Sequence, residues 1–564
     1  MGVVLHAAYR RVIKSNARTI HASVPSPVDA QPSETDWWYD HLAKQASEFA
    51  KVGFTALLLP PVSKTNTGAS PTADGYGFYD DYDIGNKDQF FSVPTRFGNR
   101  EQLQRLCAVL HANGIDPYAD MVPHQRNGGR AGVYQYRSAT GKKNGRFPKH
   151  PSCFFGPASK GRVPRDPIAG PIADDQQFGD ELCTVNSTPH KYVLNGLIDA
   201  GDWLTQTLDL KGYRIDDTKG QVSSSVLHWA NSKSMAANVA IGEYFDGNPN
   251  TLNWWVWESG INGRVYAFDF ALHFLLQRMC NNAGNFDMQQ LDHAGFAGMS
   301  PEKAVTFVEN PDTDLGDSRI MWNKLLAYAY ILTTEGYPVV FYKDYSTDNG
   351  CYGLKHGIDN LIWIHENLAN GETAYRWKDP QFVVYERTGF PNLLVGLNND
   401  MFSGWKTVTV QTGFGPNAHL HDYTGRAGDV WTDGNGKVRM GIPPNNNGQG
   451  YVCYSRASQD PKDRKNKLTT TQCFFGAEDL DIGPATNTLK PIGRIWCEEN
   501  TSIRVSVDKH VTFKVQDPAG IDIEFANGKG QSNRRGWHTI NVKSATAPQA
   551  FSLKVTYQAS LIIN

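Results

Sequence analysis

Residues 212–220 read Gly-Tyr-Arg-Ile-Asp-Asp-Thr-Lys-Gly and place an arginine and a carboxylate two positions apart. Side chains alternate between the two faces of a strand, so Arg214, Asp216 and Thr218 would share one face. A guanidinium beside a carboxylate keeps that carboxylate ionised. An ionised Asp at the end of a strand is what covalent glycosidase chemistry requires as its nucleophile. A structural ion pair on an edge strand accounts for the same pattern equally well.

Further carboxylates follow other segments that have the composition of buried strands. Asp120 begins Asp-Met-Val-Pro-His-Gln, Glu243 ends Ile-Gly-Glu, and Asp312 ends Phe-Val-Glu-Asn-Pro-Asp. With Asp216, these residues place carboxylates at the ends of four expected strands. Like charges gathered at one rim repel each other, so the arrangement does little for stability and indicates a functional site.

The elements that must position these side chains are strands that alternate with helical patterns, for example at 38–51 and 101–112. Eight strands are expected, at residues 3–9, 54–59, 115–122, 212–216, 238–244, 265–270, 304–308 and 338–342. Eight strand and helix units predict an α/β fold built as a closed parallel (β/α)8 TIM barrel, in which catalytic groups lie at the carboxyl ends of the strands. A doubly wound open sheet is the competing architecture, although it would not need eight units.

The barrel is expected to comprise residues 1–122 and 200–371. Residues 123–199 are rich in Gly, Pro, Arg and Lys and have little periodicity, so we expect an irregular inserted domain, domain B, after the third strand. After residue 372, short alternating strands replace the helices, as at 381–386, 392–397 and 406–410, with a turn signal at 433–436.

This pattern predicts C-terminal all-β domains: a β-sandwich at 372–457, a polar linker at 458–470 and an additional β-sandwich at 471–564. Trp496 and Trp537 in the last domain could stack on sugar rings and bind carbohydrate, although single tryptophans usually fill cores.

Composition describes a soluble globular protein of several domains, with 564 residues, 40% hydrophobic residues and a net charge of −2. No basic run suggests a nucleic-acid partner, and no apolar stretch is long enough to span a membrane. We expect a monomer. The apolar part of the N-terminal segment is too short for a signal peptide, so the protein is expected to be cytoplasmic, or secreted with its signal removed.

The eight cysteines have no CxxC spacing, which argues against a zinc site. Cys153 with Cys183, or Cys473 with Cys497, could form a disulfide, and free buried thiols are the equal alternative.

Four ordered motifs over about residues 1–457 resemble those of the α-amylase family of glycoside hydrolases. Gly212 to Lys219 is similar to the second conserved region of that family, Gly242-Glu243 to the third, and Phe307 to Asp312 to the fourth. The segment from Asp120 to Gly129 resembles the first region of the maltooligosaccharide-forming and plant-type α-amylases.

The resemblance implies a role for each matching residue. Asp216 is the implied nucleophile, Glu243 the general acid and then base, and Asp312 the group that stabilises the oxocarbenium-like transition state. The implied substrate-binding residues are Arg214, Tyr76, His124, Gln125, Lys219 and Asn310. Arg214 would keep Asp216 ionised, and Tyr76 would stack under the sugar at the cleavage point.

Two positions depart from the pattern of the family. The usual Asn-His at the end of the first region is His124-Gln125 here, and the usual His of the fourth region is Pro311. Gln125 can still donate a hydrogen bond, whereas Pro311 has no polar side-chain group and no backbone N–H. Losing one hydrogen bond to a transition state costs about 1–3 kcal/mol, or about ten- to hundredfold in rate. A shift of one residue in the alignment would let His124 serve as the usual histidine.

The same departures bear on metal binding. In the family, the Asn that His124 replaces binds a structural calcium ion, and the Asp that accompanies it corresponds to Thr184. Imidazole is a poor ligand for so hard a cation, so calcium is one alternative and its ligands stay unassigned. The chemistry of the paired carboxylates needs no cofactor.

Three functions follow from these residues. The first is a retaining hydrolase that cleaves internal α-1,4-glucosidic bonds of starch or maltooligosaccharides. The second is a glycosyltransferase, or a hydrolase of another α-linkage, that uses the same site. The third is a glucan-binding protein that has lost activity, which the presence of Asp216, Glu243 and Asp312 together disfavours.

Overall fold

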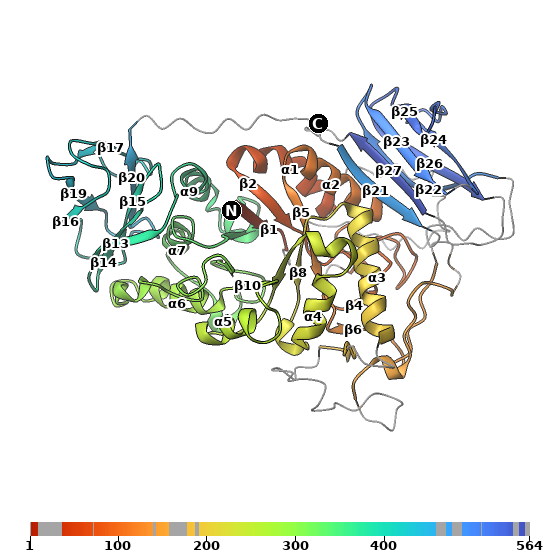
Figure 1. Cartoon of the computed structure of the whole chain (residues 1–564), viewed down its shortest axis with the longest axis horizontal. Helices are drawn as coiled ribbons and strands as arrows, with labels where there is room; N and C mark the ends of the chain where they lie inside the picture. The colour runs from red at the N-terminus through yellow and green to blue at the C-terminus, as the bar shows by residue number, and fades with distance from the viewer. Residues whose placement is uncertain are drawn as a thin grey trace. The chain divides into compact units, whose positions relative to one another are not determined.

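The structure is a computed structural model that describes residues 2–8, 37–70, 73–138, 141, 143–156, 178–185, 191–457, 470–476, 488–508, 510–544 and 552–558 (Figure 1). The chain forms two compact units. Unit 1 comprises residues 1–9, 51–56 and 241–464, and unit 2 comprises residues 10–50, 57–240 and 465–564. Each unit contains part of a parallel sheet and one all-β region.

The parallel sheet has the eight strands that the sequence predicts. They are β1 (Val3–His6), β2 (Phe54–Leu58), β5 (Asp116–Met121), β8 (Gly212–Ile215), β9 (Val239–Gly242), β10 (Tyr266–Phe268), β11 (Ala304–Val305) and β12 (Val339–Phe341). Their order in the sheet is β11-β10-β9-β8-β5-β2-β1-β12. A parallel bridge between Phe307, just after β11, and Val339 of β12 joins the two ends of the sheet, which makes the sheet a barrel. The open-sheet alternative is therefore wrong.

Helices alternate with these strands along the chain. They are α1 (Trp38–Val52), α2 (Arg100–Ala112), α3 (Lys191–Leu208), α4 (Ser223–Ala230), α5 (Pro249–Trp257), α6 (Phe270–Asn281), α7 (Lys324–Ile331), α8 (Tyr342–Tyr345) and α9 (Lys355–Asn367). α2 shows how sequence sets a boundary: Asn99 accepts from the backbone of Gln102, whose side chain accepts from the backbone of Asn99 in return. This capping box satisfies two amide groups that a helix start leaves unpaired.

Short elements fill the loops after β2 and β5 and before α3. They are β3 (Lys64–Thr65), β4 (Phe78–Asp80), β6 (Gln125–Arg126), η1 (Pro151–Cys153) and β7 (Asp180–Glu181). Further 3-10 turns are η4 (Thr218–Gly220), η5 (Lys233–Ala237), η6 (Met288–Leu291) and η7 (Gly316–Ser318). Much of the predicted inserted domain, at 157–177 and 186–190, lies outside the described residues.

The all-β region of unit 1 begins after α9. Its strands are β13 (Thr373–Lys378), β14 (Phe382–Arg387), β15 (Leu393–Asn398), β16 (Lys406–Gln411), β17 (His419–Asp422), β18 (Val430–Trp431), β19 (Lys437–Ile442) and β20 (Tyr451–Arg456). A six-stranded sheet of order β13-β14-β15-β20-β17-β18 and the pair β16-β19 enclose a core that includes Val384, Leu420 and Met440. The predicted turn at 433–436 precedes β19, and Asp433 accepts from the backbone of Asn435 and Lys437.

The all-β region of unit 2 has a four-stranded and a three-stranded sheet. Its strands are β21 (Thr470–Gly476), β22 (Lys490–Cys497), β23 (Ser502–Val507), β24 (Val511–Gln516), β25 (Lys529–Gln531), β26 (Gly536–Ser544) and β27 (Ser552–Gln558). The guanidinium of Arg105 in α2 lies 4.2 Å from the ring centre of Trp496 and 5.7 Å from that of Trp537. Both tryptophans thus pack against α2, as residues of a core do, and do not form a platform for sugar rings.

All eight cysteines are free thiols, so neither candidate pair forms a disulfide. Among the described residues, no helix has the length and apolar character needed to cross a membrane. The predicted linker at 458–470 lies outside the described residues except for Thr470, and the domain boundaries stay predictions.

Candidate active site

Asp216 follows directly after β8 and is fixed through both its backbone and its side chain. The backbone N–H of Asp216 donates to the carbonyl of Met121 at 2.8 Å, and the backbone carbonyl of Asp216 accepts from Gln221 Nε2 at 2.7 Å. Arg214 Nη1 donates to Asp216 Oδ1 at 2.9 Å. The two side chains therefore share a face, as strand alternation predicts, and Asp216 keeps only 8% of its surface exposed.

A second carboxylate, Asp120 of β5, completes the surroundings of Arg214. Asp120 and Arg214 are direct neighbours in the register of β5 and β8, and Arg214 Nη1 lies 2.6 Å from Asp120 Oδ1. Asp120 Oδ2 also accepts from the hydroxyl of Tyr76 at 2.8 Å. The structure thus joins Tyr76, Arg214 and Asp216 through Asp120, a buried residue to which the sequence motif assigned no role.

His124 and Gln125 lie next to each other in the same unit, but in a second polar cluster. His124 Nδ1 lies 3.1 Å from Gln125 Oε1 and 3.2 Å from Asp217 Oδ2, and His124 Nε2 lies 3.7 Å from Glu181 Oε1. Burial alone would lower the pKa of His124, but the Glu181 and Asp217 carboxylates outweigh burial and raise it. The two carboxylates therefore favour the protonated form of the imidazole.

Gly220 makes room for this imidazole. A Cβ at position 220 would lie 2.5 Å from Asp217 Oδ2 and 3.0 Å from His124 Nε2, which no side chain could occupy without displacing the cluster. Lys219, the preceding residue, lies half-buried in η4. Gln125 Nε2 reaches the carbonyl of Tyr76 at 3.5 Å, at the limit of a hydrogen bond.

Glu243 lies in unit 1, directly after β9. β9 pairs in parallel with β10 through Ile241 and Gly242, so the register is fixed up to the residue before Glu243. Glu243 keeps 7% of its surface exposed. Glu243 is therefore a buried residue at the end of a strand whose position is fixed by the sheet.

Asp312 lies in unit 1 in the loop after β11, and Asn310 shapes the backbone around it. Asn310 Oδ1 accepts from the backbone N–H of Asp312 at 2.9 Å and of Thr313 at 2.7 Å. This side-chain-to-backbone turn has Pro311 at its centre, where the fixed φ of proline suits a turn. The structure thus brings Asn310 and Asp312 together and leaves the Asp312 side chain exposed.

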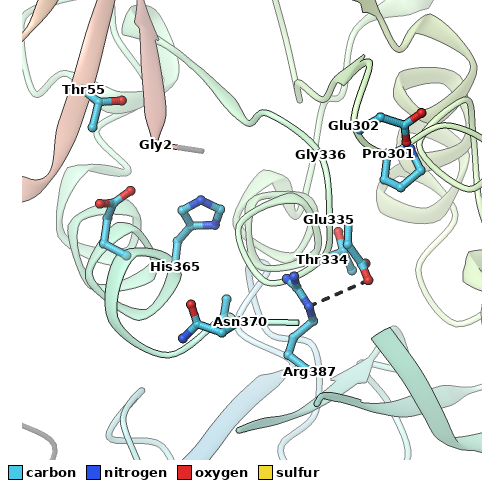
Figure 2. Close-up of a pocket in the computed structure, with 12 residues that line it drawn as sticks. Gly2, Thr55, Pro301, Glu302, Thr334, Glu335, Gly336, His365, Asn370 and Arg387 are labelled. Atoms are coloured by element: carbon cyan, nitrogen blue, oxygen red, sulfur yellow. Dashed lines mark ion pairs between the residues drawn. The ribbon is translucent and has the colours of Figure 1, made fainter. Parts of the chain in front are cut away.

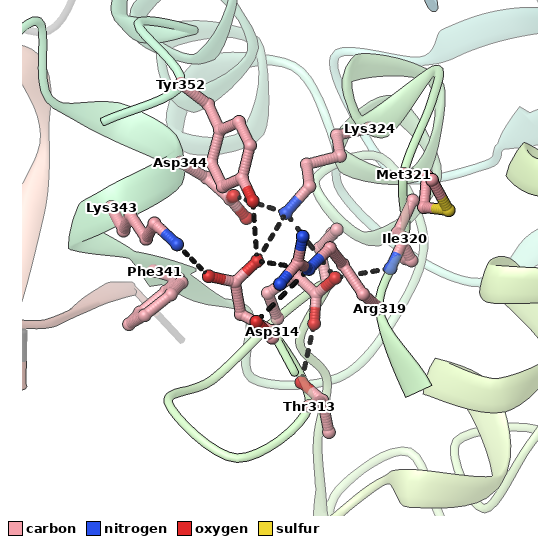
Figure 3. A network of polar contacts seen from close by, with 12 residues as sticks. Thr313, Asp314, Arg319, Ile320, Met321, Lys324, Phe341, Lys343, Asp344 and Tyr352 are labelled. Carbon is pink, nitrogen blue, oxygen red and sulfur yellow. Dashed lines mark hydrogen bonds and ion pairs between the residues drawn. The ribbon is translucent and has the colours of Figure 1, made fainter. Parts of the chain in front are cut away.

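A buried network of charges holds the ends of this loop (Figure 3). Glu309 Oε2 accepts from Thr313 Oγ1 and Oε1 from the backbone of Ile320, both at 2.6 Å. Lys324 Nζ lies 2.7 Å from Asp344, 3.4 Å from Glu309 and 3.7 Å from Asp314. Asp314 also pairs with Lys343 and accepts from the hydroxyl of Tyr352.

Burial raises the pKa of Glu309 to about 7, although Lys324 opposes this shift. For Lys324, burial would lower the pKa, but the Asp344 and Glu309 carboxylates outweigh it and raise the pKa. Lys324 is therefore a stable cation that joins three acidic side chains beneath the loop that carries Asp312.

His273 of α6 supports the same loop from another side. Its Nδ1 lies 2.8 Å from the carbonyl of Val308 and its Nε2 lies 3.2 Å from that of Ser318, while its ring stacks on Phe307. Burial lowers the pKa of His273 to about 4, and the two carbonyls only partly oppose this effect. At neutral pH the ring is uncharged.

A cavity of about 560 Å³ lies in unit 1 near the amino ends of β1, β2, β11 and β12, and none of the candidate site residues lines it (Figure 2). Arg387 at its wall donates to the carbonyls of Thr333 and Gly371, and Glu335 accepts from Thr373. These contacts tie β13 and β14 to the chain before β12, which is a structural role.

Among the described residues, no group of three or more His, Cys, Asp and Glu side chains has an arrangement that could hold a metal ion.

Comparison with known proteins gives a consistent result. Residues 393–455 match the family model described as α-amylase C-terminal. The chain is 28% identical over 478 residues to the glucan 1,4-α-maltohexaosidase of Bacillus sp. (strain 707), covering 76% of this chain and 89% of that protein. It is 30% identical over 387 residues to an α-amylase of Geobacillus stearothermophilus, covering 60% of this chain and 69% of that protein.

The fold is also that of a solved structure, the α-amylase from Geobacillus thermoleovorans complexed with acarbose. The TM-score is 0.56 at 14% identity, covering 81% of this chain and 99% of that one. The barrel, the strand-end carboxylates and the extent of these matches together show that the chain belongs to the α-amylase family of glycoside hydrolases.

Proposed function

We propose that the protein is a retaining α-glucan hydrolase that cleaves internal α-1,4-glucosidic bonds of starch or maltooligosaccharides. The pair of Arg214 and Asp216, backed by Asp120, carries the proposal, because it supplies a positioned and ionised nucleophile. The substrate class is supported by the relatives, which are named as an α-amylase and a glucan 1,4-α-maltohexaosidase.

In the first step, Asp216 attacks the anomeric carbon while Glu243 donates a proton to the leaving glycosidic oxygen. The bond between that carbon and oxygen breaks, and a glycosyl ester forms on Asp216. In the second step, Glu243 takes a proton from water, whose oxygen attacks the same carbon and releases Asp216. Asp312 would offset the positive charge that develops on the sugar in both steps.

The remaining residues are proposed to bind the sugar. The Tyr76 hydroxyl already donates to Asp120, so its ring is the part that would contact the sugar at the cleavage point. Gln125 would supply an amide donor in place of the usual histidine, and His124 would act through Gln125 and Asp217. Lys219 would contact the next sugar, and Asn310 would position Asp312 through the turn.

We propose that no structural calcium ion binds at His124. The Glu181 and Asp217 carboxylates favour the protonated form of His124, which would balance the charge that a calcium ion would otherwise balance. Imidazole is also a poor ligand for calcium, which prefers six to eight oxygen ligands.

The experiment is a time course of maltoheptaose digestion, with early products resolved by length. Hydrolysis predicts shorter sugars alone, and internal cleavage predicts a spread of lengths rather than a single end product. Longer or cyclic sugars would show transfer instead, and an unchanged substrate would contradict both enzyme proposals. Glu243→Gln should lose at least about a thousandfold in kcat, since protonation of the leaving group contributes about 10²–10⁴ and the same residue acts twice. The control, Glu258→Gln, changes an exposed residue of the same unit and should have no effect.

A further inference from the structure

Five rings form a row in unit 1, four on its all-β region and one on α9, and the proposed mechanism uses none of these residues. His419 of β17 and Trp431 of β18 are direct cross-strand partners, and their rings stack with centres 4.5 Å apart and planes 2° apart. Trp431 keeps 60% of its surface exposed. An exposed indole ring that a second ring holds in place can act as a stacking surface for a ligand.

Strand alternation extends the row along β17. Leu420 and Asp422 point inward and are buried, so His419 and His421 lie on the opposite face. The His421 ring meets the edge of Tyr423 at 5.0 Å, and Tyr423 stacks on Trp363 of α9 at 5.3 Å. The aromatic row therefore consists of Trp431, His419, His421, Tyr423 and Trp363.

Asp429 fixes the histidines in this row. Its Oδ2 lies 2.5 Å from His419 Nε2 and its Oδ1 lies 2.7 Å from His421 Nδ1. The hydrogen bond with His421 has the larger effect and that with His419 the smaller, and both lower the pKa of Asp429, so the carboxylate is ionised. One carboxylate thus holds two rings in position before any ligand arrives, which reduces the entropy lost on binding.

We propose that the aromatic row is a second carbohydrate site, which binds successive glucose rings of an α-glucan chain. The apolar face of a sugar ring stacks on an aromatic plane. Sugar hydroxyls bond to planar acceptors and donors such as the carboxylate of Asp429 and the histidine rings. The aromatic row and the Asp429 carboxylate beside it contain no lysine or arginine, so this surface does not suit a phosphate backbone. That the sugar is an α-glucan rests on the proposed function.

Binding of the full-length chain to starch granules tests this inference. The assay uses Asp216→Asn protein, so that the granules are not consumed, and measures the protein left in solution. Trp431→Ala should weaken granule binding about tenfold. His419→Ala should weaken it as well, whereas His419→Phe, which keeps a ring beneath Trp431, should retain most of it.

The matched control is Trp405→Ala. Trp405 is 53% exposed and lies over Gly441 of the other sheet, outside the aromatic row, so its loss should leave granule binding unchanged. With Asp216 intact, Trp431→Ala should keep kcat/KM on soluble maltoheptaose, which separates this site from the catalytic one.

Equal granule binding by Trp431→Ala and its parent would overturn the inference, as would an equal loss in Trp405→Ala. Binding that depends on Trp431 but shifts to cellulose granules would overturn the α-glucan assignment. If the protein does not hydrolyse starch yet binds granules through Trp431, the proposed function fails and this inference stands.

Discussion

Arg214 donates a shorter hydrogen bond to Asp120 than to Asp216: Nη1 lies 2.6 Å from Asp120 Oδ1 and 2.9 Å from Asp216 Oδ1. Asp120 is buried, so its charge must be balanced where it stands. Arg214 is thus fixed by a residue with no role in the proposed reaction, and the proposed nucleophile Asp216 binds to an arginine that Asp120 already holds in place.

Asp120→Asn tests whether this arrangement matters for catalysis. The substitution keeps the shape of the side chain and removes one charge-assisted hydrogen bond to Arg214, which is worth about 1.5–3 kcal/mol. We expect kcat to fall about ten- to hundredfold with little change in KM, because Arg214 acts on the reacting carboxylate. Asp116→Asn, at the exposed start of the same strand, is the control and should keep full activity. Wild-type kcat in Asp120→Asn would show that Asp216 needs no such support.

Lys324→Met should destabilise the fold, because it leaves Glu309, Asp314 and Asp344 buried without their shared cation. Breaking a buried ion pair on one side costs about 3–5 kcal/mol. Lys343→Met removes a more exposed partner of Asp314 and should cost about 1 kcal/mol. Urea unfolding of both variants measures the difference, and equal losses would mean that the network does not depend on Lys324.

His273 predicts a pH dependence of stability. The pKa of His273 is about 4 in the folded protein and about 6.5 in an unfolded chain, so the unfolded state binds more protons below pH 6.5. The contribution of His273 is therefore present above pH 6.5 and is lost as the pH falls to about 4. Its full size is about 3 kcal/mol.

The measurement compares the free energy of unfolding of wild type and His273→Gln between pH 7 and pH 4. Their difference should shrink toward acid, because the variant lacks the titrating group. His293→Gln, at an exposed position, should follow the wild-type curve. Parallel curves for wild type and His273→Gln would contradict the shifted pKa.

Removal of divalent metals should leave the protein intact if His124, rather than a calcium ion, occupies the place between Glu181 and Asp217. We expect EDTA dialysis to change Tm by less than about 1 °C and to leave starch hydrolysis unaffected. Recovery of lost activity on addition of calcium would contradict the assignment of His124.

The sequence was sufficient to predict all eight barrel strands and the common face of Arg214 and Asp216, because both depend on local periodicity. The ends of the strands were less well predicted. Residues 304–308 were expected to be one strand, whereas the regular part of β11 stops at Val305. The residues up to Val308 still have the composition of a strand, but the regular ladder of hydrogen bonds ends at Val305.

The partners of Arg214 and Lys324 could not be predicted in the same way. Asp120 meets Arg214 through the register of two strands that lie 94 residues apart in sequence. Lys324 joins acidic residues from the loop after β11 and from α8. Such pairs depend on which elements become neighbours, and no local pattern records that.

The central claim, a double displacement through Asp216, is tested most directly by the configuration of the first product. Proton NMR in the first minutes of maltoheptaose hydrolysis, before mutarotation, resolves the anomers of the newly formed reducing end. A covalent ester on Asp216 inverts the anomeric carbon twice and predicts the α-anomer. Initial release of the β-anomer would mean a single displacement by water and would contradict the role of Asp216 as nucleophile.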